Sequence, residues 1–494
     1  MINNGIATMH TTLYLKAIFN FERSLFRADR LDVLVAFILF AAIGYAFVNG
    51  HAWMNKQQQA VHAAQTEESA RLQDLKDTLV KIEAGSLKPP KSYQNPASAH
   101  AVGNQLAATY AILPPTSLAL TAIGQSDLNP PYTKVSGENK EIFALNEEIE
   151  NPGNLLAGNF DLAFVVVFLL PILIIALSYN LLSAEREQGT LAITMTNPVP
   201  LWVLIAGKLC FRAGFVFSMM AGMAVIGLII AGADLTASDS MVRLAWWIGL
   251  LFTYILFWFA MAVAVNVQAK SSSHNALVLT GLWIMLLLVL PTFISIAINV
   301  AYPLPSRVAM IGAIRAAQTD AGKSSDATLA RFEQEHPEMT IKPGSADDDY
   351  AASRKRVLVQ LAASERVAQI MTGYDRQLAK RQRIAEILRF LSPAIVMQEA
   401  LNAIAGTDNS RYRHLSRQVD AFRRTRQDFF MPKALNNVPL KLADYQDFPR
   451  FSYVEQAISE TGLRLFGGWL GLMIPIALLF MFTLRRIRNY PVTA

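Results

Sequence analysis

The stretch LAFVVVFLLPILIIALSYNLLSA, residues 162–184, lies between Asp161 and Glu185 and contains no charged side chain. It is longer than the roughly 20 apolar residues that a helix needs to cross about 30 Å of hydrocarbon. Lipid offers no hydrogen-bond partners to an open strand, so a helix is the element that satisfies this backbone. The stretch therefore predicts a membrane-spanning helix.

Five further segments have the same apolar character. The chain is 53% hydrophobic and only 17% charged, whereas soluble domains carry roughly 25% charged residues. We therefore expect an α-helical polytopic membrane protein with six transmembrane helices. The predicted spans cover residues 32–49, 161–183, 201–232, 244–268, 275–300 and 464–484.

Basic residues in the short flanks indicate the orientation of these spans. The loop between the third and fourth spans carries Asp234 and Asp239, and Trp246 and Trp247 next to it are expected in an aromatic belt at the outer interface. By the positive-inside rule, both termini are expected in the cytoplasm, including a tail at residues 485–494. The arginines that flank the first and last spans are Arg23, Arg27, Arg30, Arg485, Arg486 and Arg488.

Two long segments interrupt the series of spans, residues 50–160 and 301–463, and this topology places both outside the cytoplasm. Apolar residues recur at helical spacing between Lys56 and Glu83, and again in a longer stretch with Gly373 as a candidate break. We expect two mainly helical extracytoplasmic domains. Because their net charges are opposite in sign, docking of one against the other is a hypothesis.

The first 31 residues contain a different pattern. Tyr14, Ile18, Phe21 and Leu25 share one face of a helix, and basic residues occupy other faces. This pattern predicts a cytoplasmic helix that lies in the membrane interface.

A few polar residues lie within the predicted spans. Lys208 and Arg212 lie four residues apart near the start of the third span. We interpret them as side chains that snorkel to the inner interface, and the alternative is a charge that lines a pathway. Asn266 and Asn275 lie near span ends, where polar residues are inexpensive, so they are assigned no role.

The loop after the second span, residues 184–200, combines charged residues, a glycine break and two prolines. We expect a short helix parallel to the membrane, joined by the glycine turn and stopped by the prolines. Charges at its exposed end are available to a cytoplasmic partner. The candidate partner-binding residues are Glu185, Arg186, Glu187, Gly189, Thr190 and Leu191.

The pattern Glu-x-Glu-x-Gly-Thr-Leu in this loop resembles the coupling segment of ABC-2 type transporter permeases, the transmembrane subunits of exporter-like ABC transporters. The resemblance implies a multi-pass protein of the bacterial inner membrane that works with a second permease copy or a paralogue. It also implies a separate cytoplasmic ABC ATPase that binds the ATP. This chain would then be a permease and not an enzyme, with no cofactor or metal of its own. The two large insertions depart from many family members, so the resemblance implies no particular substrate.

Two other functions stay open. One is a mechanotransmitting or signalling subunit that acts on a periplasmic partner without transport. The other is a membrane enzyme, which would need an acid, histidine or metal cluster in an outer domain. The seven histidines are scattered and Cys210 is the single cysteine, so no metal-ligand spacing appears. Residues 317–324 resemble a phosphate loop, but Ala317 stands where that motif requires glycine.

Overall fold

The computed structural model is mainly helical, and six helices in the part of the chain it describes are long and apolar enough to cross a membrane. This confirms the expected number of spans. The candidate spans are Arg30–Glu83, Leu162–Glu187, Leu201–Ile230, Ser238–Asn266, Ser272–Ala301 and Ser459–Ile487. The structure describes residues 2–124, 126, 130–137, 159–196, 199–303, 307–335, 348–436 and 438–491.

The elements fall into two groups. Those of the span bundle and its attached short helices are α1 (Ile2–Ala28), α2 (Arg30–Glu83), α6 (Leu162–Phe164), η4 (Val165–Leu169), α7 (Leu170–Ser178), α8 (Ser183–Glu187), α9 (Thr190–Thr194), α10 (Leu201–Ile230), α11 (Ser238–Asn266), α12 (Ser272–Ile284), η5 (Met285–Val289), α13 (Leu290–Ala301) and α19 (Ile458–Ile487). Those of the two insertions are η1 (Ser92–Gln94), α3 (Ala99–Ala101), η2 (Val102–Leu106), β1 (Thr109–Ile112), η3 (Ala119–Thr121), β2 (Tyr132–Val135), α14 (Arg307–Lys323), α15 (Ser325–Glu335), α16 (Asp348–Leu388), η7 (Arg389–Leu391), α17 (Pro393–Ala405), α18 (Asn409–Leu435) and η8 (Leu442–Tyr445).

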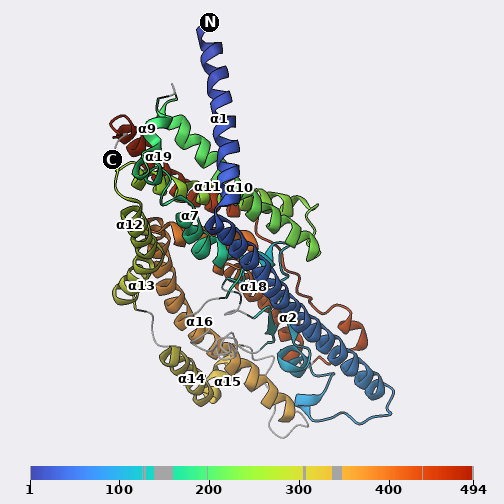
Figure 1. Cartoon of the computed structure of the whole chain (residues 1–494). Helices are drawn as coiled ribbons and strands as arrows, with labels where there is room; N and C mark the ends of the chain where they lie inside the picture. The colour runs from blue at the N-terminus through green and yellow to red at the C-terminus, as the bar shows by residue number, and fades with distance from the viewer. Residues whose placement is uncertain are drawn as a thin grey trace.

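Both ends of the chain lie at the same end of the bundle (Figure 1). Ile18 of α1 and Tyr490 after α19 pack into one apolar cluster with Leu191 of α9. We call this end the terminal side, and the opposite end, where β1, β2 and α14–α16 lie, the insertion side. A chain whose two ends lie on the same side must cross the membrane an even number of times.

Two of the spans form the centre of the bundle. The most apolar windows of α11 and of the span that contains α7 are each 67% buried, whereas those of the other spans are 17–28% buried. Trp247 of α11 is 1% exposed and belongs to the central core, so its expected place in an aromatic belt is wrong. The outer spans present apolar side chains on the surface that lipid would cover.

Two spans contain a π-helical turn just before a proline. η4 precedes Pro171 and η5 precedes Pro291. Proline has no N–H, so carbonyls one turn earlier lose their backbone donor. Side chains from other helices replace it: the Tyr254 hydroxyl donates to the Val167 carbonyl at 3.0 Å, and the Ser392 hydroxyl donates to the Leu286 carbonyl at 2.7 Å.

The long helix α2 joins the first span to the first insertion without a break (Figure 1). Its 54 residues correspond to roughly 80 Å at 1.5 Å per residue, well beyond the thickness of a bilayer. The predicted boundary at residue 50 is therefore not a structural break. The candidate break at Gly373 is also absent, because α16 runs through that position.

Helix α17 belongs to the bundle more than to a separate domain. Its side chains Met397, Leu401 and Ile404 lie in the same core cluster as α11 and α19. Arg243 of α11 donates to the Ile404 carbonyl at 3.0 Å and so holds the end of α17. The sequence interpretation placed this segment in an outer domain, and its apolar residues are too few to span a bilayer. In the structure it packs along the spans, and Ser392 at its start donates to the Leu286 carbonyl midway along the fifth span.

The two insertions pack against each other through buried arginines of α18. Arg426 is almost fully buried and donates to the Thr109 hydroxyl and to the carbonyls of Gly103 and Ala107. Its burial lowers its pKa to about 10. Arg411 donates to the Pro114 carbonyl at 2.6 Å. The hypothesis that the insertions dock is supported by these contacts, although the arginines bind carbonyls of the first insertion and not its carboxylates.

We expect Tyr254→Phe to destabilise the bundle by about 1 kcal/mol, because the Val167 carbonyl then loses its side-chain donor in an apolar environment. The measurement is the free energy of unfolding by steric trapping in bicelles. Tyr45→Phe is the matched control, because Tyr45 is 60% exposed. Equal stability of the two variants would contradict the assigned role of the hydroxyl.

Candidate functional site

The segment predicted to contact a partner folds as two short helices joined by a glycine turn. Gly189 has φ +71°, a left-handed conformation that side chains disfavour, and it separates α8 from α9. The Thr190 hydroxyl donates to the Glu185 carbonyl at 3.1 Å across this turn. Leu191 is fully buried and anchors α9 among Leu182 and Leu204. We call residues 183–196 the α8–α9 turn.

The Glu185 carboxylate faces the span bundle. Its carboxylate accepts a hydrogen bond from Lys208 Nζ of α10 at 2.7 Å. The same ammonium donates to the Leu181 carbonyl at 2.9 Å and lies 3.9 Å from Glu22 of α1. Arg212, one turn along α10, binds the other oxygen of Glu22 at 2.9 Å. These four side chains, Glu22, Glu185, Lys208 and Arg212, form a cluster that we call the charge cluster.

The charge cluster corrects the interpretation of Lys208 and Arg212 as snorkelling side chains. Lys208 is 4% exposed and Glu22 is 2% exposed, so both charges are buried together. A buried charge is tolerated when it is paired and hydrogen-bonded. Lys208 therefore joins three parts of the chain, the α8–α9 turn, the third span and the N-terminal helix.

The position of α1 depends on this contact and on close helix packing. Glycine at position 207 lets α1 approach α10 so closely that an added Cβ would lie 2.7 Å from Ile18. Phe19 packs edge-on against Phe211 at 5.1 Å between ring centres. Phe21, on the face predicted to enter the membrane, is exposed. Placement of α1 in the interface stays a prediction, whereas its attachment to the third span is a feature of the fold.

Glu187 and Arg186 connect the α8–α9 turn to the next loop on the terminal side. The Glu187 carboxylate accepts from the Ser272 backbone N–H at 2.7 Å and from the Ser272 hydroxyl at 2.9 Å. Arg186 donates to the Lys270 carbonyl at 3.1 Å and lies over the ring of Tyr490. These contacts hold the turn against the start of α12 and the end of the chain.

Asn266 and Asn275, which the sequence analysis left without a role, lie at the centre of this region. Both are fully buried. The Asn266 side chain accepts from the Leu182 N–H and donates to the Ser178 carbonyl. Asn275 donates to Asn266 and to the Ser183 hydroxyl, each at 3.3 Å. The sequence signal that could have identified them is that each polar side chain lies in a span without charged residues. A polar group buried in such a span requires a hydrogen-bond partner.

Glu187 contributes to the outward surface of the α8–α9 turn, whereas Glu185 is only partly exposed. Gln188, Gly189 and Thr190 are exposed, and Ile193 is 70% exposed. Ile193 is thus an apolar side chain on the outward surface of the turn. The predicted site residues are thus brought together, but Glu185, Arg186 and Leu191 attach the turn to its own chain.

Neither the segment that resembles a phosphate loop nor a group of metal-ligating residues forms a site in the described part of the chain. Ala317 and the residues up to Lys323 lie in the last turns of α14, so no phosphate loop exists there. Within the described ranges, no three His, Cys, Asp or Glu side chains are grouped so that they could hold a metal ion.

Comparison with known proteins gives one family match. A family model described as a domain of unknown function, DUF3526, matches residues 307–454. This region begins at α14 and ends shortly before α19, so it covers most of the second insertion and none of the six candidate spans. No curated protein matches the chain.

We expect Glu185 and Lys208 to be energetically coupled, and a double-mutant cycle of Glu185→Gln and Lys208→Met measures this. Because Lys208 is buried, Glu185 is only partly exposed and the two charges are 2.7 Å apart, the coupling free energy should be about 1–3 kcal/mol. The single variant Lys208→Met and the double variant both lose the contact with the Leu181 carbonyl. The free energy of that loss therefore cancels in the cycle.

The matched control is the same cycle on the exposed pair Arg331 and Glu335, with Arg331→Met and Glu335→Gln. An exposed pair of this kind contributes about 0.5 kcal/mol or less. If both cycles gave the same small value, the charge cluster would not hold the α8–α9 turn.

Proposed function

We propose that this chain is the transmembrane permease subunit of an ABC-2 type transporter in the bacterial inner membrane. It would couple ATP hydrolysis by a separate cytoplasmic ATPase to the movement of a substrate across the bilayer. The observation that carries the proposal is the α8–α9 turn, whose outer surface is exposed while its inner surface is bound to several spans. The terminal side would face the cytoplasm, and the insertions would face the periplasm.

The contacts of the turn support a lever function. Glu185 connects it to the third span through Lys208, and Glu187 connects it to the start of the fifth span through Ser272. Leu182, at the base of α8, is bound to Asn266 at the end of the fourth span. A force applied to Ile193 would therefore reach three spans through short polar contacts, and not through a flexible loop.

Under this proposal, the mechanism uses these contacts. ATP binding closes two ATPase subunits, and closure pushes each α8–α9 turn towards the membrane. The spans attached to the turn tilt, and access to the pathway changes sides. The chain itself provides the lever and the pathway, and the hydrolysis belongs to the partner. A second copy or a paralogue of this chain completes the permease.

A second function, mechanotransmission to a periplasmic partner without transport, is favoured by one observation. α2 runs unbroken from beside α1 into the insertion, and α16 is another long rigid helix that extends from η7 at the bundle to the insertion side (Figure 1). Stiff helices of this length carry motion away from the membrane. ATP-dependent movement of a substrate into vesicles supports the permease, whereas ATPase activity that changes only with an added periplasmic partner supports mechanotransmission.

We expect Ile193→Asp to detach the ATPase without disturbing insertion in the membrane, because it places a charge on the exposed apolar contact. The tagged chain is purified from its native membranes in mild detergent, and associated subunits are labelled with 8-azido-ATP. Retention of the labelled subunit should fall about tenfold or more, as for loss of a central interface residue.

Val454→Asp in the second insertion is the matched control, since Val454 is 66% exposed and lies outside the candidate spans. It should retain the labelled subunit at the wild-type level. Absence of any ATP-labelled subunit from the wild-type preparation, or equal retention by both variants, would refute the proposal.

A further inference from the structure

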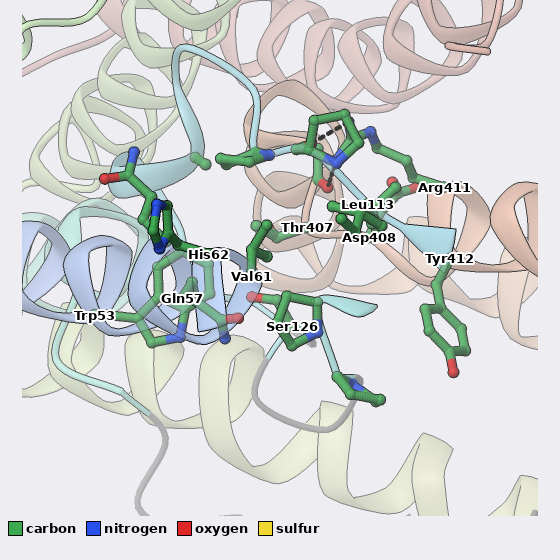
Figure 2. A pocket seen from close by; sticks show the side chains of 18 of the residues that line it. Trp53, Gln57, Val61, His62, Leu113, Ser126, Thr407, Asp408, Arg411 and Tyr412 are labelled. Carbon is green, nitrogen blue, oxygen red and sulfur yellow. Dashed lines mark hydrogen bonds between the residues drawn. The ribbon is translucent and has the colours of Figure 1, made fainter. Parts of the chain in front are cut away.

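A cavity of about 350 Å³ lies on the insertion side, directly above the span bundle. One wall is the face of α2 that carries Trp53, Gln57 and Val61, and the opposite wall is formed by residues around Thr407 and Arg411 at the junction of α17 and α18 (Figure 2). Cavities that bind small molecules usually measure about 300–1,000 Å³. The size of this one fits a small ligand.

The lining of the cavity is largely apolar and rigid. Aromatic rings come from Trp53 and Tyr412, which belong to helices of the two different insertions. The remaining apolar wall includes Ile112, Leu113 and four prolines from the segments that follow β1 and precede β2. These prolines are Pro114, Pro115, Pro130 and Pro131. Because proline and aromatic side chains have few rotatable bonds, little conformational entropy is lost when a ligand orders them.

The carboxylate and the guanidinium group of the lining are already neutralised within the chain, and His62 adds an imidazole to the lining. Asp408 binds Arg464 at 3.0 Å, and Arg411 binds Glu455 at 2.7 Å. Burial opposes ionisation of Glu455, but the hydrogen bond and charge of Arg411 outweigh it and hold the pKa of Glu455 below its usual range. A ligand with a net charge would find no free counter-charge at these pairs and would lose its hydration on entry.

One polar group of the lining lacks a partner. The Oε1 atom of Gln57 is buried and accepts no hydrogen bond, although the residue lines the cavity. Rotation of the amide would bring this oxygen within reach of an occupant. A buried acceptor of this kind costs free energy until a donor reaches it. Gln58 and Gln65 add further amide groups to the lining. The cavity therefore offers amide groups and an apolar wall to an occupant.

We infer that this cavity binds an uncharged, mainly apolar small molecule that donates a hydrogen bond to Gln57. The inference does not depend on an ATPase partner. The cavity floor includes Ala119, whose neighbours Leu118 and Leu120 belong to the same core cluster as the spans. Thr407 follows directly on α17, which packs on α11 and α19. A ligand in this cavity thus contacts elements that rest on the bundle.

The test uses two probes with one aromatic skeleton. N-phenyl-1-naphthylamine is uncharged and has one N–H donor, and 8-anilinonaphthalene-1-sulfonate adds a negative charge to the same rings. The full chain in nanodiscs carries Cys210→Ser and Gln58→Cys, the latter labelled with a trifluoroethyl group at the cavity. We expect the uncharged probe to shift the ¹⁹F resonance saturably, and the sulfonate to give no saturable shift.

Gln57→Leu keeps the side-chain volume and removes the acceptor, so it should weaken binding of the uncharged probe roughly threefold to tenfold. Gln59→Leu is the matched control on the outward face of α2 and should leave the affinity unchanged. Val61→Phe fills the cavity and should abolish the saturable shift, with elution on a sizing column confirming that each variant is folded.

Three results would overturn the inference. The first is a shift that rises linearly with probe concentration, which indicates partition into lipid. The second is equal or tighter binding of the sulfonate, which indicates a site for anions. The third is an affinity in folded Gln57→Leu equal to that of Gln59→Leu, which excludes Gln57 as the acceptor.

Discussion

The arrangement of the terminal side depends on the pairing of buried charge. Lys208 lies in a span whose only other charged residue is Arg212, and its ammonium cannot remain there without partners. The chain meets this requirement with Glu185 of α8, the Leu181 carbonyl and the nearby Glu22 of α1. Pairing of one buried amine thus fixes the place of the α8–α9 turn and of the N-terminal helix. Since breaking a buried pair leaves an uncompensated charge, these elements are expected to move together.

The same requirement explains other contacts in the molecule. Carbonyls that lose a donor ahead of Pro171 and Pro291 bind Tyr254 and Ser392. Asn266 and Asn275 bind backbone groups and each other at the ends of spans. On the insertion side, Arg426 crosses between the two insertions to reach carbonyls. In each case a side chain distant in sequence satisfies a polar group that water does not reach, which positions one element against another.

The sequence predicted the six spans, because a long apolar run without charges has few possible structures other than a membrane-spanning helix. The sequence did not predict where α2 ends. Neither the composition nor the glycine content of this segment distinguishes a helix that ends at the membrane surface from one that continues beyond it. α17 was assigned to an outer domain because its apolar run is short, and only the packing on α11 and α19 reveals its place.

The candidate site was predicted in part. The glycine turn and the buried Leu191 follow from local sequence. The direction of Glu185 does not, because its partner Lys208 lies in the next span and the second acid of the cluster, Glu22, lies in the N-terminal helix. The local sequence pattern identifies charged residues that are unusual beside an apolar span. The residue with which each one pairs depends on how the helices pack. The same limit applies to the cavity, whose walls come from both insertions.

The central claim is that the α8–α9 turn faces the cytoplasm while the insertions face the opposite side. It is tested most directly by labelling single cysteines in the Cys210→Ser background with a membrane-impermeant maleimide. The account predicts that in intact spheroplasts the reagent labels Ser86→Cys and does not label Gln188→Cys, and that both are labelled once the membrane is permeabilised. Labelling of Gln188→Cys from outside in intact spheroplasts would contradict the account.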